Sequence, residues 1–163
     1  MKNTQRRSFF VASFCLLSSQ IPSSAQQLIF FSSPTKNINC MYEPTQPPNP
    51  PYTKVSSDAY VRCDIMQFNP TLKSVPQQSK EEIEIFGKCT IAQMKAFIIQ
   101  EKGVQTKTYC PTDVPISDGQ FILDYEKNFT RGGLTCISQI NGMTCQNGLG
   151  RGFFLSRSSQ RLF

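Results

Sequence analysis

Six cysteines downstream of residue 25 are the residues whose type and spacing most clearly allow chemistry. An even number of cysteines in an oxidising compartment indicates disulfide bonds, whereas common zinc sites combine closely spaced cysteines with histidine. The chain has no histidine and no Cys-x-x-Cys pair, so we expect disulfides and no metal site. Neighbouring cysteines bracket hairpin-like stretches, which favours sequential pairing among the connectivities that remain open. The predicted pairs are Cys40–Cys63, Cys89–Cys110 and Cys136–Cys145.

The absence of histidine also limits the enzyme classes that fit the chain. Ser-His-Asp and Cys-His catalytic groups are excluded, whereas a glycan hydrolase needs only two suitably spaced carboxyl groups. Four carboxylates lie close in sequence, but aspartates in turn-like segments commonly cap their own backbone. We therefore expect no enzyme activity and no cofactor, and we keep a carboxylate-based glycan hydrolase as an alternative. The four candidates are Asp113, Asp118, Asp124 and Glu126.

Three arginines near the C-terminal end are the strongest candidates for contact with a ligand. A cluster of positive charge can hold an anionic glycan, a lipid headgroup or an acidic partner. The alternative is that these side chains are solvated and make one internal salt bridge, which contributes little. The predicted anion-contacting residues are Arg151, Arg157 and Arg161.

The N-terminal segment has the pattern of an export signal. Basic residues precede the apolar run Phe9–Leu17, and small residues follow up to Ala25, which is the order of a cleavable signal peptide. The run is shorter than the ~20 apolar residues that a membrane-spanning helix needs. We predict a signal peptide over residues 1–25, export to the periplasm or extracellular space, and no stable membrane insertion after cleavage. The Arg6-Arg7 pair leaves the twin-arginine route open beside the general secretory route.

The remaining residues, 26–163, are predicted to form a single disulfide-stabilised domain. Three of the 17 basic residues and none of the 11 acidic residues lie in the predicted signal, so the net charge falls from +6 to +3. A charge this small and dispersed argues against nucleic acid as a partner. Residues 44–57 contain five prolines and are expected to form an extended surface loop.

Short apolar runs separated by glycine-containing turns indicate an all-β fold. We expect a small antiparallel sandwich or barrel built from hairpins. Residues 95–100 are predicted to form a strand, although 90–102 also contains good helix formers. Alternation of polar and apolar residues predicts another strand at 82–85. The apolar runs are 61–65, 83–86, 97–99, 121–123 and 153–155.

Residues 135–145 give the most detailed local prediction. A bond between Cys136 and Cys145 places the two cysteines directly opposite each other, where the cross-strand Cβ separation suits a disulfide. The same register pairs Gln139 with Gly142 and leaves two residues at the turn, with glycine available for a left-handed position. The other predicted pairs are Ile137–Thr144 and Ser138–Met143.

Seven short segments follow one another in order over most of the chain after the predicted signal. They are Phe31–Cys40, Val61–Ile65, Cys110–Asp113, Leu123–Tyr125, Leu134–Ser138, Gly142–Asn147 and Gly150–Arg157. This set resembles a family of small exported bacterial proteins classed as a domain of unknown function. The resemblance implies an exported disulfide domain and no established activity. It also implies glycine where this chain has Lys36 and Glu126, so two turns are expected to be affected.

These observations favour a non-enzymatic binding or interaction module of the cell envelope or extracellular space. Its partner would be an envelope or extracellular protein or a glycan. The alternatives are an inhibitor of an extracellular hydrolase, the carboxylate-based glycan hydrolase, and a purely structural envelope component.

Overall fold

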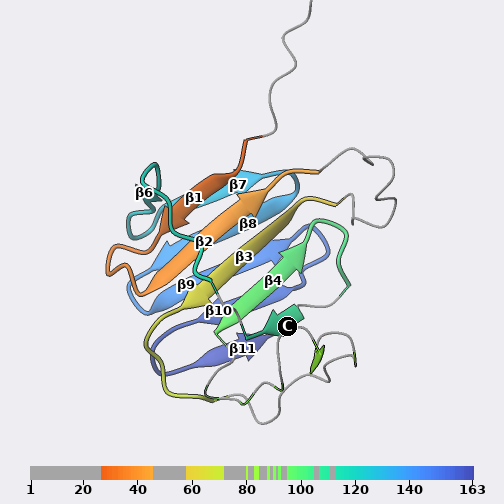
Figure 1. Cartoon of the computed structure of the whole chain (residues 1–163). Helices are drawn as coiled ribbons and strands as arrows, with labels where there is room; N and C mark the ends of the chain where they lie inside the picture. The colour runs from red at the N-terminus through yellow and green to blue at the C-terminus, as the bar shows by residue number, and fades with distance from the viewer. Residues whose placement is uncertain are drawn as a thin grey trace, which may run out of the picture.

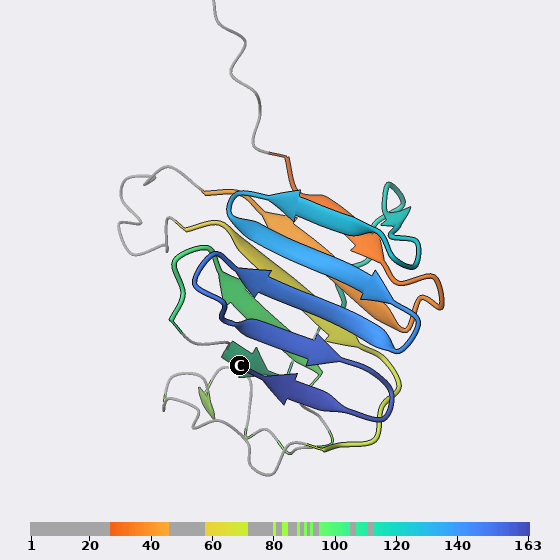
Figure 2. The same ribbon diagram turned by 180° about the vertical axis from the view of Figure 1, so that it is seen from behind.

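The computed structural model describes residues 27–45, 58–71, 80, 83–84, 88, 90, 92, 95–104, 107–110 and 113–163. These residues form eleven β-strands in two sheets that face each other across a buried core (Figure 1, Figure 2). The predicted all-β sandwich is confirmed, and the two sheets remain separate rather than closing into a barrel.

Sheet A has six strands in the order β5-β4-β3-β2-β1-β6. All neighbours are antiparallel except β1 and β6, which run parallel. The predicted strand at 95–100 is confirmed as β4. The strands are β1 Ile29–Ser32, β2 Ile38–Glu43, β3 Tyr60–Ile65, β4 Ala96–Gln100, β5 Lys107–Tyr109 and β6 Phe121–Ile122.

Sheet B is an antiparallel meander in which each strand pairs with the next along the chain, in the order β11-β10-β9-β8-β7. The hairpin predicted at 135–145 is β8–β9, and every predicted pair is found, from Cys136–Cys145 to Gln139–Gly142. The strands are β7 Asn128–Arg131, β8 Leu134–Gln139, β9 Gly142–Asn147, β10 Gly152–Leu155 and β11 Gln160–Leu162.

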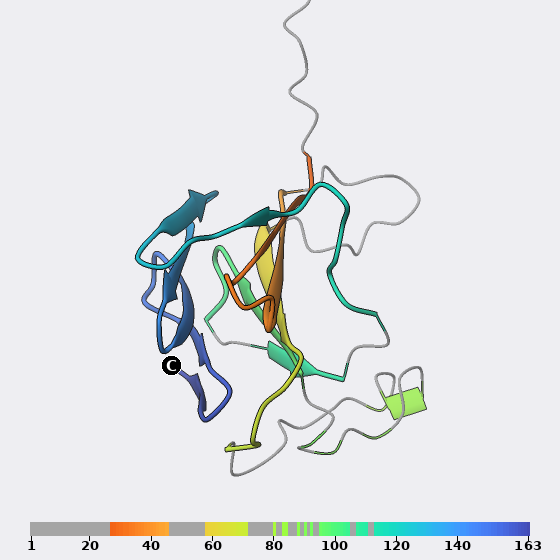
Figure 3. The same ribbon diagram turned by 90° about the vertical axis from the view of Figure 1, so that its left-hand side faces the viewer.

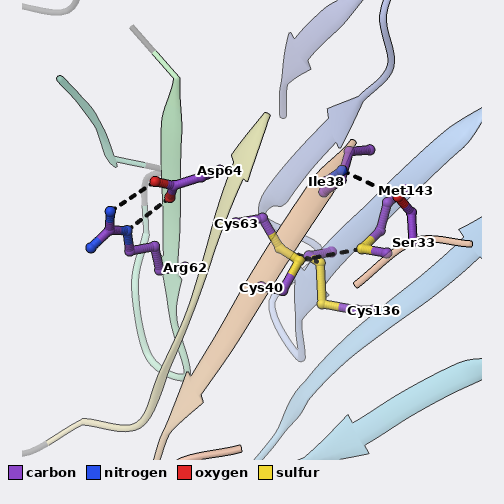
Figure 4. The surroundings of a disulfide bond; sticks show 9 residues. Ser33, Ile38, Cys40, Arg62, Cys63, Asp64, Cys136 and Met143 are labelled. Atoms are coloured by element: carbon purple, nitrogen blue, oxygen red, sulfur yellow. Dashed lines mark hydrogen bonds and ion pairs between the residues drawn. A yellow bond between two sulfur atoms is a disulfide. The ribbon is translucent and has the colours of Figure 1, made fainter. Parts of the chain in front are cut away.

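Two disulfides meet at the centre of the core (Figure 4). Cys40–Cys63 joins β2 to β3 in sheet A, and Cys136–Cys145 joins β8 to β9 in sheet B. The sulfurs of Cys63 and Cys145 are 3.7 Å apart, and the Met143 thioether lies 3.4 Å from the Cys40 sulfur. The disulfides of the two sheets therefore pack directly against each other. Two of the three predicted pairings are confirmed.

The third predicted pairing lies only partly within the described residues. Cys110 is disulfide-bonded, and its predicted partner, Cys89, lies outside them. The predicted signal over 1–25 and nearly all of the 44–57 loop also lie outside. Of the strand predicted at 82–85, only Ile83 and Glu84 are described. Both are exposed and belong to neither sheet, so that prediction is wrong for these two residues.

The segment 113–123 crosses the outer face of sheet A in front of its central strands and includes β6 at the edge of that sheet (Figure 1). The chain then passes over to sheet B and leads into β7 (Figure 3). None of the helices among the described residues is long and apolar enough to cross a membrane.

Candidate functional site

The turns at one end of the sandwich enclose a cleft of about 300 Å³. It lies where the β1–β2, β8–β9 and β10–β11 turns meet the loop that leads into β7. Serine, threonine, asparagine and glutamine side chains dominate its wall, together with one tyrosine and one arginine. The lining residues are Ser33, Thr35, Asn37, Ile38, Tyr125, Gln139, Ile140, Asn141, Gly142, Ser156, Arg157 and Ser158. We call this space the end cleft.

Arg157 is the charged residue of the end cleft. Its guanidinium donates a hydrogen bond to the side-chain carbonyl of Gln67 at 3.1 Å, and its backbone carbonyl accepts one from the amide of Asn69 at 2.7 Å. The ion pairs of the described residues join Arg62 to Asp64 and Asp113, and Lys102 to Asp58. Arg157 therefore has no carboxylate partner in this part of the chain. A neutral amide fixes its position, and no acidic side chain of the described residues compensates its positive charge.

The partner of Arg157 is itself held in place by Asn37. The Asn37 side chain donates to the backbone carbonyl of Gln67 at 3.0 Å and accepts from the backbone amide of Gln67 at 2.9 Å. A reciprocal pair of this kind ties the β1–β2 turn to the segment after β3. The result is a continuous chain of contacts from Asn37 through Gln67 to the guanidinium.

Two turns beside the end cleft contain the non-glycine residues with positive φ found in the described residues. Lys36 (φ 54°) lies between Thr35 and Asn37 in the β1–β2 turn, and Glu126 (φ 62°) follows Tyr125. These are the two positions at which the family resemblance implies glycine. A side chain in this left-handed region costs about 1–2 kcal/mol, and such strain is found more often at functional sites than elsewhere. The turns keep a geometry suited to glycine although the residues are not glycine.

The serines of the end cleft are partly committed to holding its turns. The Ser33 hydroxyl accepts from the amide of Ile38 at 3.1 Å. The Ser156 hydroxyl accepts from the amide of Ser159 at 3.0 Å and donates to its carbonyl at 3.2 Å. A hydroxyl has one proton and two acceptor lone pairs, so these groups stiffen the turns while they also line the wall.

The three arginines predicted to contact an anion do not form one patch. Arg157 lies in the end cleft, whereas Arg151 lies in the β9–β10 turn at the opposite end of β10. Arg161 lies on β11, where its guanidinium covers the ring of Phe154 at 4.8 Å from the centroid. Of the three, Arg157 lines the end cleft.

The four carboxylates considered for a hydrolase are also dispersed among different turns and contacts. The Asp113 carboxylate pairs with Arg62 at 3.2 Å. Asp118 lies in the turn 117–120, and Asp124 and Glu126 flank Tyr125, with all three exposed. None of the four lines the end cleft.

The most deeply buried charges lie on the outer face of sheet A rather than in a cleft. Arg62 and Asp64 project from β3 and form two parallel hydrogen bonds of 2.8 Å. The Arg62 guanidinium also donates to the backbone carbonyl of Asp113 at 2.6 Å. Arg62 is 6% exposed and Asp64 1% exposed. Burial raises the pKa of Asp64, and the hydrogen bonds and charge of Arg62 oppose this rise. This cluster anchors the segment 113–123 to the sheet.

The sulfurs of Cys40, Cys63 and Cys145 lie within 4.8 Å of one another. Thiolates so arranged can bind a metal ion, but these sulfurs are in disulfide bonds, and the thiolate is the form of cysteine that binds metals. The cluster is part of the core in the oxidised protein.

The sequence predictions named one residue of the end cleft and missed the others. The neutral residues come from four separate turns, and Gln67 lies 90 positions from Arg157. Asn141-Gly142 was recognised as a turn, and turns often carry binding residues, but no short motif joins these segments. The association becomes visible only when the strands are assembled.

A family model described as "Family of unknown function (DUF6636)" matches residues 12–163. No curated protein matches the chain, and no solved structure matches it. The matched range covers all eleven strands, the confirmed disulfides and the end cleft, so the chain belongs to this family of unknown function.

Proposed function

We propose that this protein is a non-enzymatic binding module of the cell envelope or extracellular space, and that the end cleft is its binding site. One observation carries the proposal. Arg157, which is held by a neutral amide, lies in a cleft whose other described lining residues are mainly uncharged polar ones, together with Tyr125, Gly142 and two isoleucines. Ligand sites combine a concave shape with a few fixed polar groups in this way.

Chemistry supports binding over catalysis at this site. None of the described residues that line the end cleft carries a carboxyl group, so they offer no pair of acidic residues for glycan hydrolysis. The Arg157 guanidinium, which has no acidic partner among the described residues, instead favours attachment of a carboxylate or phosphate, which it can engage through two parallel hydrogen bonds.

Export also belongs to the proposal. The two described core disulfides fit an oxidising compartment, and the sequence of residues 1–25 has the pattern of a cleavable signal. In this compartment the candidate ligands are envelope or extracellular proteins and glycans.

Capture from an envelope extract tests the proposal. The oxidised protein is immobilised, and bound proteins and glycans are compared for wild type, Arg157→Gln and Arg151→Gln. The two variants lose the same charge from exposed turns at opposite ends of β10. We expect Arg157→Gln to lose the ligand and Arg151→Gln to retain it. Equal capture by both variants would overturn the assignment of the site, and no capture by folded wild type would favour a structural role.

A further inference from the structure

A second cleft adjoins the end cleft at Arg157. Its volume is about 370 Å³. Arg157 lines both spaces, and Gln67 lines the second. Because both clefts share Arg157 as a lining residue, we treat them as two halves of one longer site. The residues of the second cleft are Met66, Gln67, Phe68, Asn69, Ala92, Lys95 and Arg157.

The charge of the combined site is uniformly positive. Arg157 and Lys95 line it, and neither forms an ion pair with the described residues. None of the described residues in either lining is an aspartate or a glutamate. Among the described residues, no acidic side chain pairs with Arg157 or Lys95. The whole chain carries 11 acidic residues.

The neutral part of the lining suits a polyhydroxylated ligand. Serine and threonine hydroxyls and asparagine and glutamine amides can both donate and accept hydrogen bonds. Tyr125, which is 38% exposed, offers an aromatic face in the first cleft, and Phe68 offers another in the second. Such rings can pack against the apolar faces of sugar rings while the amides contact their hydroxyls.

The walls of the two clefts are less suited to an extended peptide. Extended peptides often bind by adding a strand to an open sheet edge. The walls here are turns and segments outside the strands, apart from the end residues Ile38, Gln139 and Gly142. Together with the hydroxyl-rich lining, this favours a glycan over an acidic peptide.

We propose that the two clefts together bind an acidic oligosaccharide, with a sugar carboxylate on Arg157 and a second acidic group beside Lys95. This inference rests on the proposed function and specifies its ligand class. It predicts that affinity depends on both the carboxylates and the length of the glycan, because a single uronic acid carries one carboxylate for two cations.

The test measures binding of the oxidised protein to uronic acid tetrasaccharides of three kinds: galacturonate, mannuronate and a hyaluronan fragment. Carboxyl-reduced tetrasaccharides, monomeric uronates and a glutamate tetrapeptide serve as comparisons. We expect at least one acidic tetrasaccharide to bind and its reduced form to bind roughly 10-fold more weakly or worse, since hydrogen bonds to charged groups dominate.

Two variants separate the halves of the site. Arg157→Gln should weaken tetrasaccharide and monomer alike by roughly 10-fold or more. Lys95→Gln should weaken the tetrasaccharide about 3-fold and leave the monomer unchanged, as removal of one exposed charge contact does. Lys102→Gln, which removes a surface lysine outside both clefts, is the matched control and should bind like wild type.

Binding by none of the acidic tetrasaccharides up to about 5 mM, where even weak sites are occupied, would overturn the inference. So would tighter binding of the glutamate tetrapeptide, or equal binding of reduced and acidic glycans. Lys95→Gln binding the tetrasaccharide like wild type would overturn the two-cleft arrangement. In each case, Arg157-dependent capture from envelope extract would still stand, so failure here is distinguishable from failure of the proposed function.

Discussion

Arg62 and Arg157 are both arginines joined to a distant part of the chain, but their partners differ. Arg62 is buried and binds two aspartates, one on its own strand and one on the segment 113–123. Arg157 is exposed, and among the described residues its guanidinium binds the neutral amide of Gln67. The fold depends on Arg62 because its loss would leave the buried Asp64 unpaired, whereas Arg157 has no acidic partner among the described residues. If the proposed function is correct, the two arginines separate folding from binding.

The largest expected effect is a loss of stability on substitution of Arg62. Arg62→Leu leaves Asp64, which is 1% exposed, as a buried carboxylate without its cation. Removal of one partner from a buried pair costs about 3–5 kcal/mol, which urea denaturation would measure. The double variant Arg62→Leu/Asp64→Leu removes both charges and should recover most of this loss. A loss below about 1 kcal/mol for Arg62→Leu would be typical of a surface ion pair and would contradict the assigned role.

The Arg62→Leu variant should also be unusually sensitive to pH. Burial raises the pKa of Asp64, and Arg62 opposes that rise, so removal of Arg62 raises this pKa further. A carboxyl whose pKa is higher in the folded state stabilises the fold at low pH, and this contribution is lost as the pH rises through the folded pKa. The difference in stability between wild type and Arg62→Leu should therefore shrink as the pH falls from 7 towards 4. A constant difference over that range would show that Asp64 does not titrate in the variant.

Substitution of Arg157 should have only a small effect on stability. Arg157→Gln removes an exposed side chain with one hydrogen bond to an exposed partner. Its free energy of unfolding should stay within about 0.5 kcal/mol of wild type, as for most surface substitutions, while binding is lost. A thermal unfolding scan on the sample used for capture would check this. A loss of several kcal/mol would place Arg157 with Arg62 among the structural residues.

Two substitutions in the turns around the end cleft should increase the stability of the fold. Lys36→Gly and Glu126→Gly should each stabilise the fold by about 0.5–1 kcal/mol, because glycine adopts positive φ without the steric cost paid by other residues. Lys127→Gly is the matched control, since Lys127 is exposed and does not have positive φ, and it should be destabilising. Equal effects of all three substitutions on chemical denaturation would contradict the strain inferred at these turns.

The sequence predicted those parts of the fold that depend on local pairing. In the β8–β9 hairpin, a turn and two cysteines define one register, and each predicted pair is present. The apolar run at 61–65 likewise lies in β3. The glycines implied at Lys36 and Glu126 corresponded to real left-handed positions.

The sequence could not predict contacts between distant segments. Nothing near Arg62 indicates that Asp113, 51 positions away, covers it. The three arginines looked clustered because they are close in sequence, but a strand rises about 3.3 Å per residue, so Arg151 and Arg157 lie on the order of 15–20 Å apart across β10. The end cleft also depends on Gln67 and Tyr125, which no motif connects to Arg157.

Placement of a photo-crosslinker at two positions tests most directly whether the end cleft is the binding site. Ile140, 80% exposed, lies on the end cleft, and Leu149, 61% exposed, lies in the turn at the other end of β9. Each position in turn receives a photoreactive amino acid, and the oxidised protein is irradiated in envelope extract. We predict a specific crosslinked product from position 140 that competes with unlabelled wild type, and none from position 149. A competed product from position 149 alone would contradict the end cleft as the binding site.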